Sequence, residues 1–151
     1  YSKRTKLIEI IEKPLWTVTG KTAADTLMPD IVSISVVNGE WQFIIFDAKY
    51  YNAKLGPGIS PKAQPGIESV TKQYLYQLAY QEFIDEHKFS SVKNCFILPT
   101  EESAVLDKGE VTLQMLSKIG LQSIKVRFLP AKMAYDSYLS GRKLDISLLR
   151  L

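Results

Sequence analysis

The sequence predicts an α/β domain in which a mixed central β-sheet is flanked by helices. Apolar runs rich in Val, Ile and Phe at residues 31–37, 41–50, 91–99 and 123–130 predict strands. The pair Asn38-Gly39 between the first two runs is the strongest short signal for a β-hairpin. Segments of helical character precede, separate and follow these strands. Strands that alternate with helices in this way are typical of a sheet covered on its faces by helices.

The helices and loops are predicted from periodicity and from proline and glycine positions. Residues 3–13 fit a short helix that ends at Pro14, and residues 68–88 fit one long helix. Residues 131–140 fit a third helix that ends at Gly141. Residues 110–116 fit either an edge strand or a helix. Residues 52–66 contain three Gly and three Pro, which rules out a regular element there. We expect the apolar face of the long helix to contain Val70, Tyr74, Leu78 and Phe83, with Leu75 and Ile84 beside them.

The length, composition and net charge of the chain limit the class of protein. The 151 residues are enough for a single domain spanning residues 1–151, and because the chain starts at Tyr1 we expect it to be a fragment of a longer protein. No apolar run approaches the ~20 residues of a membrane-spanning helix. The single Cys95 excludes an internal disulfide and fits a reducing, cytoplasmic location. A net charge of +3 permits a polyanionic partner without establishing one.

A two-residue turn at Asn38-Gly39 sets the register of the predicted hairpin. Val36 then opposes Trp41, and Asp30 opposes Asp47. Alternation puts one set of apolar residues on one face, which we expect to be the core face: Val32, Ile34, Val36, Trp41, Phe43 and Ile45. Asp30, Asp47 and Lys49 lie at the far end of that face. A three-residue loop would move Asp30 to the other face, and a four-residue loop would pair it with Lys49.

The negative charges of two opposed carboxylates repel each other unless another group compensates for them. Directly opposed residues have Cβ atoms roughly 4.5–5.5 Å apart, where like charges destabilise the pair. A divalent cation such as Mg²⁺ supplies that compensation because it prefers carboxylate oxygens. Lys49 would add a fixed positive charge beside the site. In the alternative interpretation, Asp30 only starts a strand, and Asp47 and Lys49 form an exposed ion pair of little energetic value.

These residues resemble a known nuclease pattern. Pro29-Asp30, sixteen residues and then Asp47-Ala48-Lys49 match the PD-(D/E)XK pattern. The surrounding text, "PDIVSISVVNGEWQFIIFDAKYYN" followed by "GIESVTKQYLYQLAYQEF", is similar to the catalytic region of LlaJI-type restriction endonucleases, relatives of the McrC nuclease subunit. The resemblance covers about residues 29–98. It implies a restriction-endonuclease-like core with the order α-β-β-α-β-β.

The resemblance also implies a role for each matching residue. Asp30 and Asp47 would coordinate Mg²⁺, or Mn²⁺ in its place, and the Ala48 carbonyl would add a backbone ligand. Lys49 would orient or activate the attacking water. Gln77 on the following helix would support the site, with Gln73 one turn away and Tyr80 as the matching aromatic residue. An acid of the first helix would join them, and Glu9 is favoured over Glu12.

The function that follows is a Mg²⁺-dependent DNA endonuclease, the cleavage domain of a restriction endonuclease in a restriction-modification system. Double-stranded DNA would be its substrate, and a homodimer or an NTPase or specificity subunit its partner. No base-reading module is recognisable, although Lys54 and Lys62 in the loop after the motif could approach the DNA backbone. Two alternatives remain: a non-catalytic module of this fold for DNA binding or assembly, and an α/β domain without a nucleic-acid role.

Overall fold

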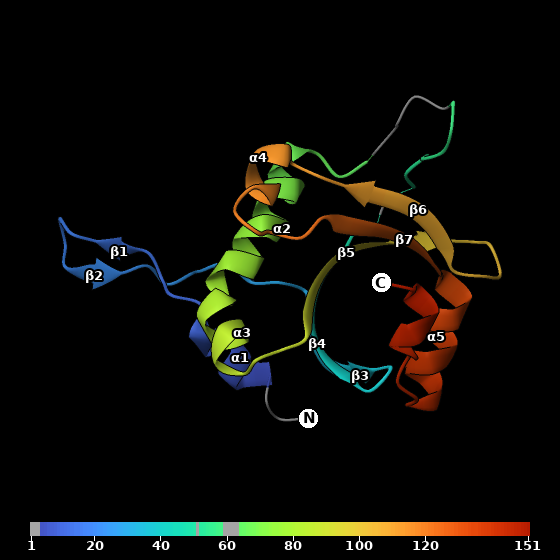
Figure 1. The fold of residues 1–151 in the computed structure, drawn as a ribbon, viewed down its shortest axis with the longest axis horizontal. Helices are drawn as coiled ribbons and strands as arrows, with labels where there is room; N and C mark the ends of the chain where they lie inside the picture. Colours follow the sequence, from blue (N-terminus) through green and yellow to red (C-terminus); the bar gives the residue numbers. More distant parts are fainter. Residues whose placement is uncertain (1–3, 51, 59–63) are drawn as a thin grey trace.

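A five-stranded mixed sheet forms the centre of the fold (Figure 1). The computed structural model describes residues 4–50, 52–58 and 64–151. In spatial order the strands are β3 (Ile31–Val37), β4 (Glu40–Ala48), β5 (Ser91–Thr100), β7 (Ile124–Pro130) and β6 (Leu106–Val111). The central strands β4, β5 and β7 are parallel, whereas β3 and β6 pair antiparallel at the edges. The predicted mixed α/β architecture is therefore confirmed.

Helices cover the sheet unequally. One face carries α1 (Arg4–Ile10), α2 (Ile67–Ala79) and α3 (Gln81–Glu86), while α5 (Ala131–Ser140) and the 3₁₀ helix η1 (Ile146–Leu149) lie on the other side (Figure 1). The short α4 (Gln114–Ser117) precedes β7, and a small hairpin of β1 (Leu15–Trp16) and β2 (Lys21–Thr22) projects from the body. No described helix has the length and apolarity to span a membrane.

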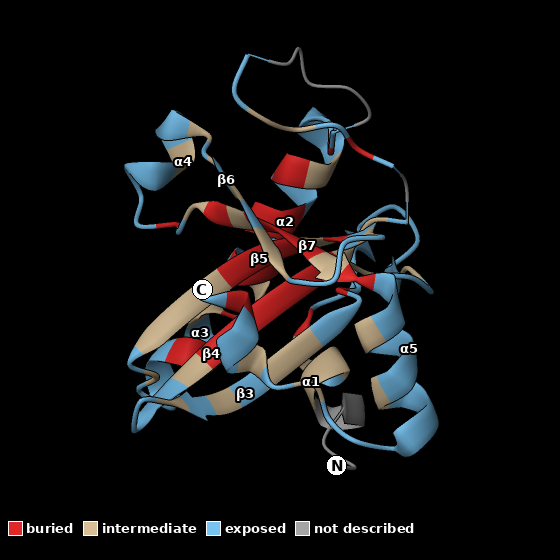
Figure 2. Ribbon diagram, turned by 90° about the vertical axis from the view of Figure 1, so that its right-hand side faces the viewer, coloured by how far each residue is buried: buried red, intermediate tan, exposed pale blue. Residues whose placement is uncertain are grey.

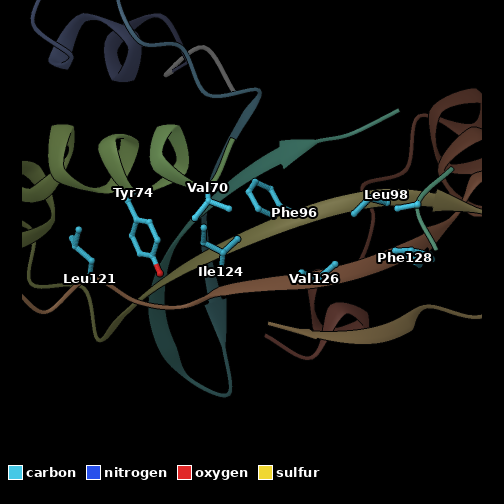
Figure 3. Close-up of a cluster of buried hydrophobic side chains, with 9 residues drawn as sticks. Val70, Tyr74, Phe96, Leu98, Leu121, Ile124, Val126 and Phe128 are labelled. Carbon is cyan, nitrogen blue, oxygen red and sulfur yellow. The ribbon is translucent and has the colours of Figure 1, made fainter. Parts of the chain in front are cut away.

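The buried residues gather along the central strands, as Figure 2 shows. Where α2 covers β5 and β7, Val70 and Tyr74 pack against Phe96 and Ile124 (Figure 3). On the opposite face, Leu149 of η1 covers a smaller cluster that includes Ile44 and Phe46 of β4 and Cys95 of β5. Burial raises the pKa of the Cys95 thiol to about 12, which fits the inert structural thiol of an apolar strand.

The predicted core face of the hairpin is only partly correct. Phe43 and Ile45 are fully buried beneath the helices, but Ile34, Val36 and Trp41 are exposed. The middle of β4 is buried, whereas the end of the hairpin near its turn is exposed (Figure 2). Burial of β4 on both faces also replaces the expected alternation, because a central strand of a covered sheet has no solvent face.

The predicted long helix is two helices, because the chain bends at Tyr80. The backbone of Tyr80 (φ −98°, ψ 0°) leaves the helical region, and its ring is buried 5.2 Å from the ring of Phe43. The predicted apolar face is also partly wrong: Leu75 and Leu78 are exposed, while Gln73 and Gln77 are buried. The helix is rotated so that these glutamines reach a polar partner inside the fold.

Most other elements follow the sequence. The strands at 91–99 and 123–130 and the helix ending at Gly141 (φ +65°) are confirmed, while the first helix is shorter than the predicted 3–13. Residues 110–116 combine both expectations, because β6 ends at Val111 and α4 follows. The β1–β2 hairpin was not predicted. Lys54 is exposed, whereas Lys62 lies outside the described residues.

Arg127 attaches the C-terminal segment to the sheet. Its side chain is buried, and Nε donates to the Leu149 carbonyl at 2.7 Å while Nη2 donates to the Arg150 carbonyl at 2.9 Å. Nη1 reaches Asp107 of β6 at 2.7 Å. A single cation therefore holds β6, β7 and the segment that covers the second face of β4.

We predict that Arg127→Ala costs about 3 kcal/mol of unfolding free energy, because buried carbonyls lose their donor. Lys125 is the matched control: it lies two residues away on the same strand and pairs with Glu110, but it is far more exposed. Lys125→Ala should cost at most about 1 kcal/mol. Urea unfolding of both variants measures the difference, and equal losses would contradict the attachment role of Arg127.

Candidate functional site

The hairpin register brings Asp30 and Asp47 together. Asn38 (φ +52°) and Gly39 (φ +81°) both adopt the left-handed conformation that a type I′ turn requires. The ladder then runs from the Val37–Glu40 pair to the Ile31–Phe46 pair, which is the predicted two-residue-turn register. Asp30 directly precedes the last pair and Asp47 directly follows it. The two acids therefore lie at the same end of β3 and β4.

The two carboxyls interact with each other and with the backbone. Asp30 Oδ2 accepts a hydrogen bond from the Ala48 N–H at 2.8 Å, which fixes Asp30 against the end of β4. Asp47 is buried, and this burial raises the pKa of its carboxyl above the ordinary value. Lys49 lowers that pKa, while the Asp30 carboxyl raises it by charge and by hydrogen bonding. The two carboxyls are therefore close enough to interact electrostatically.

Lys49 contributes a positive charge to this cluster. Its Nζ lies 2.5 Å from Asp47 Oδ2 and 6.0 Å from the centre of the Phe96 ring. The Lys49 N–H donates to the Ile97 carbonyl at 2.8 Å, so β5 fixes the backbone from which the side chain extends. Both side chains of this ion pair are largely buried, unlike the exposed pair of the alternative interpretation.

The donor atoms fit a hard divalent cation. Asp47 Oδ2 is shielded from solvent and receives no hydrogen bond of regular geometry, although Lys49 lies beside it. A buried carboxylate oxygen next to a second carboxyl suits an oxygen-binding cation. Among the described residues no group of three His, Cys, Asp or Glu side chains could hold a metal. The protein ligands would then be the two carboxyls and a backbone oxygen, for which Ala48 remains the prediction.

Tyr76 is a site neighbour that the sequence did not reveal. Its hydroxyl donates to the Met28 carbonyl at 3.0 Å, two residues before Asp30. Burial raises the pKa of Tyr76 to about 12, and the negative charges of Asp47 and Asp30 contribute to this increase. Tyr76 therefore anchors the segment that leads into Asp30 and lies within the field of both acids. The only sequence signal for Tyr76 was its position as an aromatic residue in the predicted helix after the motif, where it was given no role.

The helix glutamines form a buried polar network beside the site. Gln73 Nε2 donates to the Ile45 carbonyl at 2.9 Å and to Asn94 Oδ1 at 3.3 Å. Asn94 Nδ2 donates to Gln77 Oε1 at 2.6 Å, and Gln77 Oε1 also accepts from the Gln122 N–H. Gln73 thus binds β4 two residues before Asp47, whereas Gln77 binds β5 and the segment just before β7. The supporting role predicted for Gln77 is untested, and Gln73 is the glutamine in contact with β4.

The remaining candidates are Tyr80, Glu9 and Glu12. The Tyr80 ring packs on Phe43, four residues before Asp47. Glu12 lines a groove between α1 and the α2–α3 junction, and Glu9 is exposed on α1. Within residues 4–50, 52–58 and 64–151, neither acid completes a three-acid cluster with Asp30 and Asp47. A catalytic role for Glu9 stays a prediction.

We predict that Asp47→Asn stabilises the metal-free fold at neutral pH. The folded chain keeps a proton on Asp47 where the unfolded chain has lost it, so stability falls as the pH rises from the ordinary value of 3.8 through the higher folded-state value. Asn does not ionise, so the variant does not lose stability as the pH rises. Its greater stability relative to the wild-type chain should disappear below pH 3.8. Urea unfolding across pH in EDTA measures it.

Glu110→Gln provides the control of opposite sign. Lys125 lowers the pKa of Glu110 through a hydrogen bond and charge, so this group adds stability above its ordinary value of 4.5 and loses it at lower pH. Glu110→Gln should therefore be less stable than the wild-type chain at neutral pH. An Asp47→Asn variant that behaves like Glu110→Gln would show that the Asp47 environment favours its charged form.

Comparisons with known proteins relate the chain to restriction enzymes. The sequence model of the LlaJI restriction endonuclease family matches residues 2–132. A Bacillus subtilis (strain 168) protein, the type II restriction enzyme BsuMI component YdjA, is 26% identical over 148 residues. That alignment covers 94% of this chain and 30% of the relative, so the chain spans less than a third of the relative's length. No solved structure matches the chain. Because the family model covers most of its residues, the chain belongs to the LlaJI restriction endonuclease family.

Proposed function

We propose that the chain is the DNA-cleaving domain of a restriction endonuclease and hydrolyses phosphodiester bonds with Mg²⁺, or with Mn²⁺ in its place. The observation that carries this proposal is the pairing of Asp30 and Asp47 with Lys49 at the end of β4. Family membership supports a role in restriction. The fit of these residues to the PD-(D/E)XK pattern supports the reaction type.

The chemistry assigns a task to each group. In hydrolysis, water adds to phosphorus, the bond from phosphorus to the leaving sugar oxygen breaks, and that oxygen takes up a proton. A bound divalent cation supplies charge neutralisation and lowers the pKa of its water. Asp30 and Asp47 would hold that cation, and the Ala48 carbonyl would complete the protein ligands. Lys49 would stabilise the charge that develops on the phosphate oxygens and orient the attacking water.

The groups around the acids keep this arrangement in place. Gln73 fixes β4 through the Ile45 carbonyl, and Tyr76 fixes the approach to Asp30 through the Met28 carbonyl. The hydrogen bond from the Ala48 N–H orients Asp30. Each contact reaches the backbone within two residues of a proposed metal ligand, so the carboxyls are positioned before substrate arrives.

The description of the B. subtilis relative as a component supports a composite enzyme. The B. subtilis protein is a component of a type II restriction enzyme, and this chain corresponds to 30% of it. We propose that double-stranded DNA is the substrate and that further sequence or a partner supplies recognition of the target. The partner would be a specificity or NTPase subunit, or a second copy that delivers a second active site.

We predict that Lys49→Ala reduces plasmid nicking by about 100-fold or more in Mg²⁺ or Mn²⁺, because developing phosphate charge loses its cation. Lys132→Ala is the matched control, since Lys132 also pairs with an aspartate, Asp136, at 2.6 Å but lies exposed on α5. The control should keep full activity. Equal nicking by wild type and Lys49→Ala would contradict catalysis at this site, and absence of nicking by the wild-type chain with either metal would favour the non-catalytic module.

A second prediction concerns metal binding in the absence of DNA. At 100-fold excess over its dissociation constant, Mn²⁺ should stabilise the wild-type chain by about 2.7 kcal/mol and raise Tm by about 5 °C or more. Asp30→Asn and Asp47→Asn should lose this shift. The same scan of Glu9→Gln tests whether Glu9 joins the ligands. A full Tm shift in both aspartate variants would place the metal elsewhere.

A further inference from the structure

The β1–β2 hairpin forms an exposed arm, defined here as residues 13–23. Every residue from 13 to 22 is exposed, and the arm projects away from the sheet and its helices (Figure 1). Three large apolar side chains lie on it: Leu15 and Trp16 are each 63% exposed and Val18 is 93% exposed. Because the arm buries none of these side chains against the core, its sequence is not explained by folding alone.

Hydrogen bonds give the arm a defined shape. The Trp16 carbonyl accepts from the Gly20 N–H at 2.8 Å and from the Thr19 N–H at 3.1 Å, and Gly20 (φ +64°) closes the turn. At the base, the Ala23 N–H donates to the Pro14 carbonyl at 2.7 Å. A preformed ribbon loses little conformational entropy when it binds a partner.

The charge of the arm selects the class of partner. Lys13 and Lys21 are its only charged residues, and the nearest acids, Glu12 and Asp25, lie outside it. Lys21 pairs with Trp16 in the ladder, so a cation and an exposed indole ring lie side by side. By contrast, the groove between α1, α2 and α3 is bordered by Glu12, Glu82 and Glu86, which would repel phosphate groups.

We propose that the arm binds duplex DNA next to the candidate active site, with its lysines at phosphates and Trp16 and Val18 directed into a groove. The major groove is about 12 Å wide and admits a two-stranded β-ribbon, and apolar side chains of other proteins insert between base steps. Eight positions separate Thr22 from Asp30, a reach of at most about 28 Å. This distance is shorter than one helical turn of DNA, about 34 Å. The identity of the ligand rests on the proposed function.

The chain has two tryptophans, which allows a direct test. Trp41 at the end of the other hairpin is 57% exposed, close to the value for Trp16. Trp41→Phe leaves Trp16 as the single reporter, and Trp16→Phe leaves Trp41. Each chain is titrated with a labelled 20-base-pair duplex in EDTA, which prevents metal-dependent cleavage. We expect DNA to quench the fluorescence of Trp16 at the concentrations where duplex anisotropy rises, and to leave Trp41 unchanged.

The lysines are tested by the salt dependence of the same binding. Lys13→Gln with Lys21→Gln should weaken binding and reduce the slope of log K against log salt by about 2, or about one per phosphate contact. Lys132→Gln with Lys143→Gln makes the same change in charge at exposed positions in and just after α5 and should leave the slope unchanged. Thermal unfolding by circular dichroism confirms that each variant is folded.

The outcomes separate the arm from the active site. Anisotropy that rises while Trp16 fluorescence stays constant would overturn the proposal, even if the chain cleaves DNA. Equal slopes for the two lysine pairs would overturn it as well, and so would the absence of duplex binding by the wild-type chain. Because binding is measured without metal, loss of catalysis does not affect the result. A quenched Trp16 in a chain that cleaves nothing would support the arm and contradict only the proposed reaction.

Discussion

Because the turn at Asn38 and Gly39 has two residues, β3 and β4 are held in a single register, and the candidate site depends on it. A slip of one residue would move Asp30 to the opposite face of the ribbon and separate it from Asp47. The backbone reinforces the register at the other end, where the Ala48 N–H donates to Asp30. The register is thus fixed at both ends of the hairpin, and the acid pair lies at the end opposite the turn. The sheet extends from that hairpin through the parallel pairing of β4 with β5.

This placement of charge opposes stability in the metal-free chain. Burial and the Asp30 carboxyl both raise the pKa of Asp47, and Lys49 offsets only part of that effect. A divalent cation at this site, as proposed above, would relieve this unfavourable electrostatic arrangement. The rest of the fold supplies the necessary rigidity. Gln73 and Asn94 cross-link α2, β4 and β5 by buried hydrogen bonds, and Arg127 secures the segment that covers the far face of β4.

The elements that could be predicted from the sequence are those determined by residues close to each other along the chain. The hairpin depends on one turn dipeptide and on alternation, and its register followed from both. The rotation of α2 did not, because the buried side of that helix carries Gln73 and Gln77, which an apolar pattern leaves out. Both glutamines are hydrogen-bonded to Asn94, a partner from a distant strand. The arm could have been recognised from Gly20 between Thr-rich flanks, but its strands of two residues each give almost no periodic signal.

The composition of the arm also limits what it can contribute to recognition. Discrimination between bases relies mainly on bidentate contacts from Arg, Lys, Asn or Gln, each worth about 1–3 kcal/mol. Residues 13–23 contain no Arg, Asn or Gln, and their two lysines are the groups best suited to phosphates. An arm of this kind would position and deform the duplex, and would contribute little to recognition of its base sequence. Specific proteins bind their sites about 4–10 kcal/mol more tightly than other DNA, so most of that difference would have to come from other sequence or another subunit.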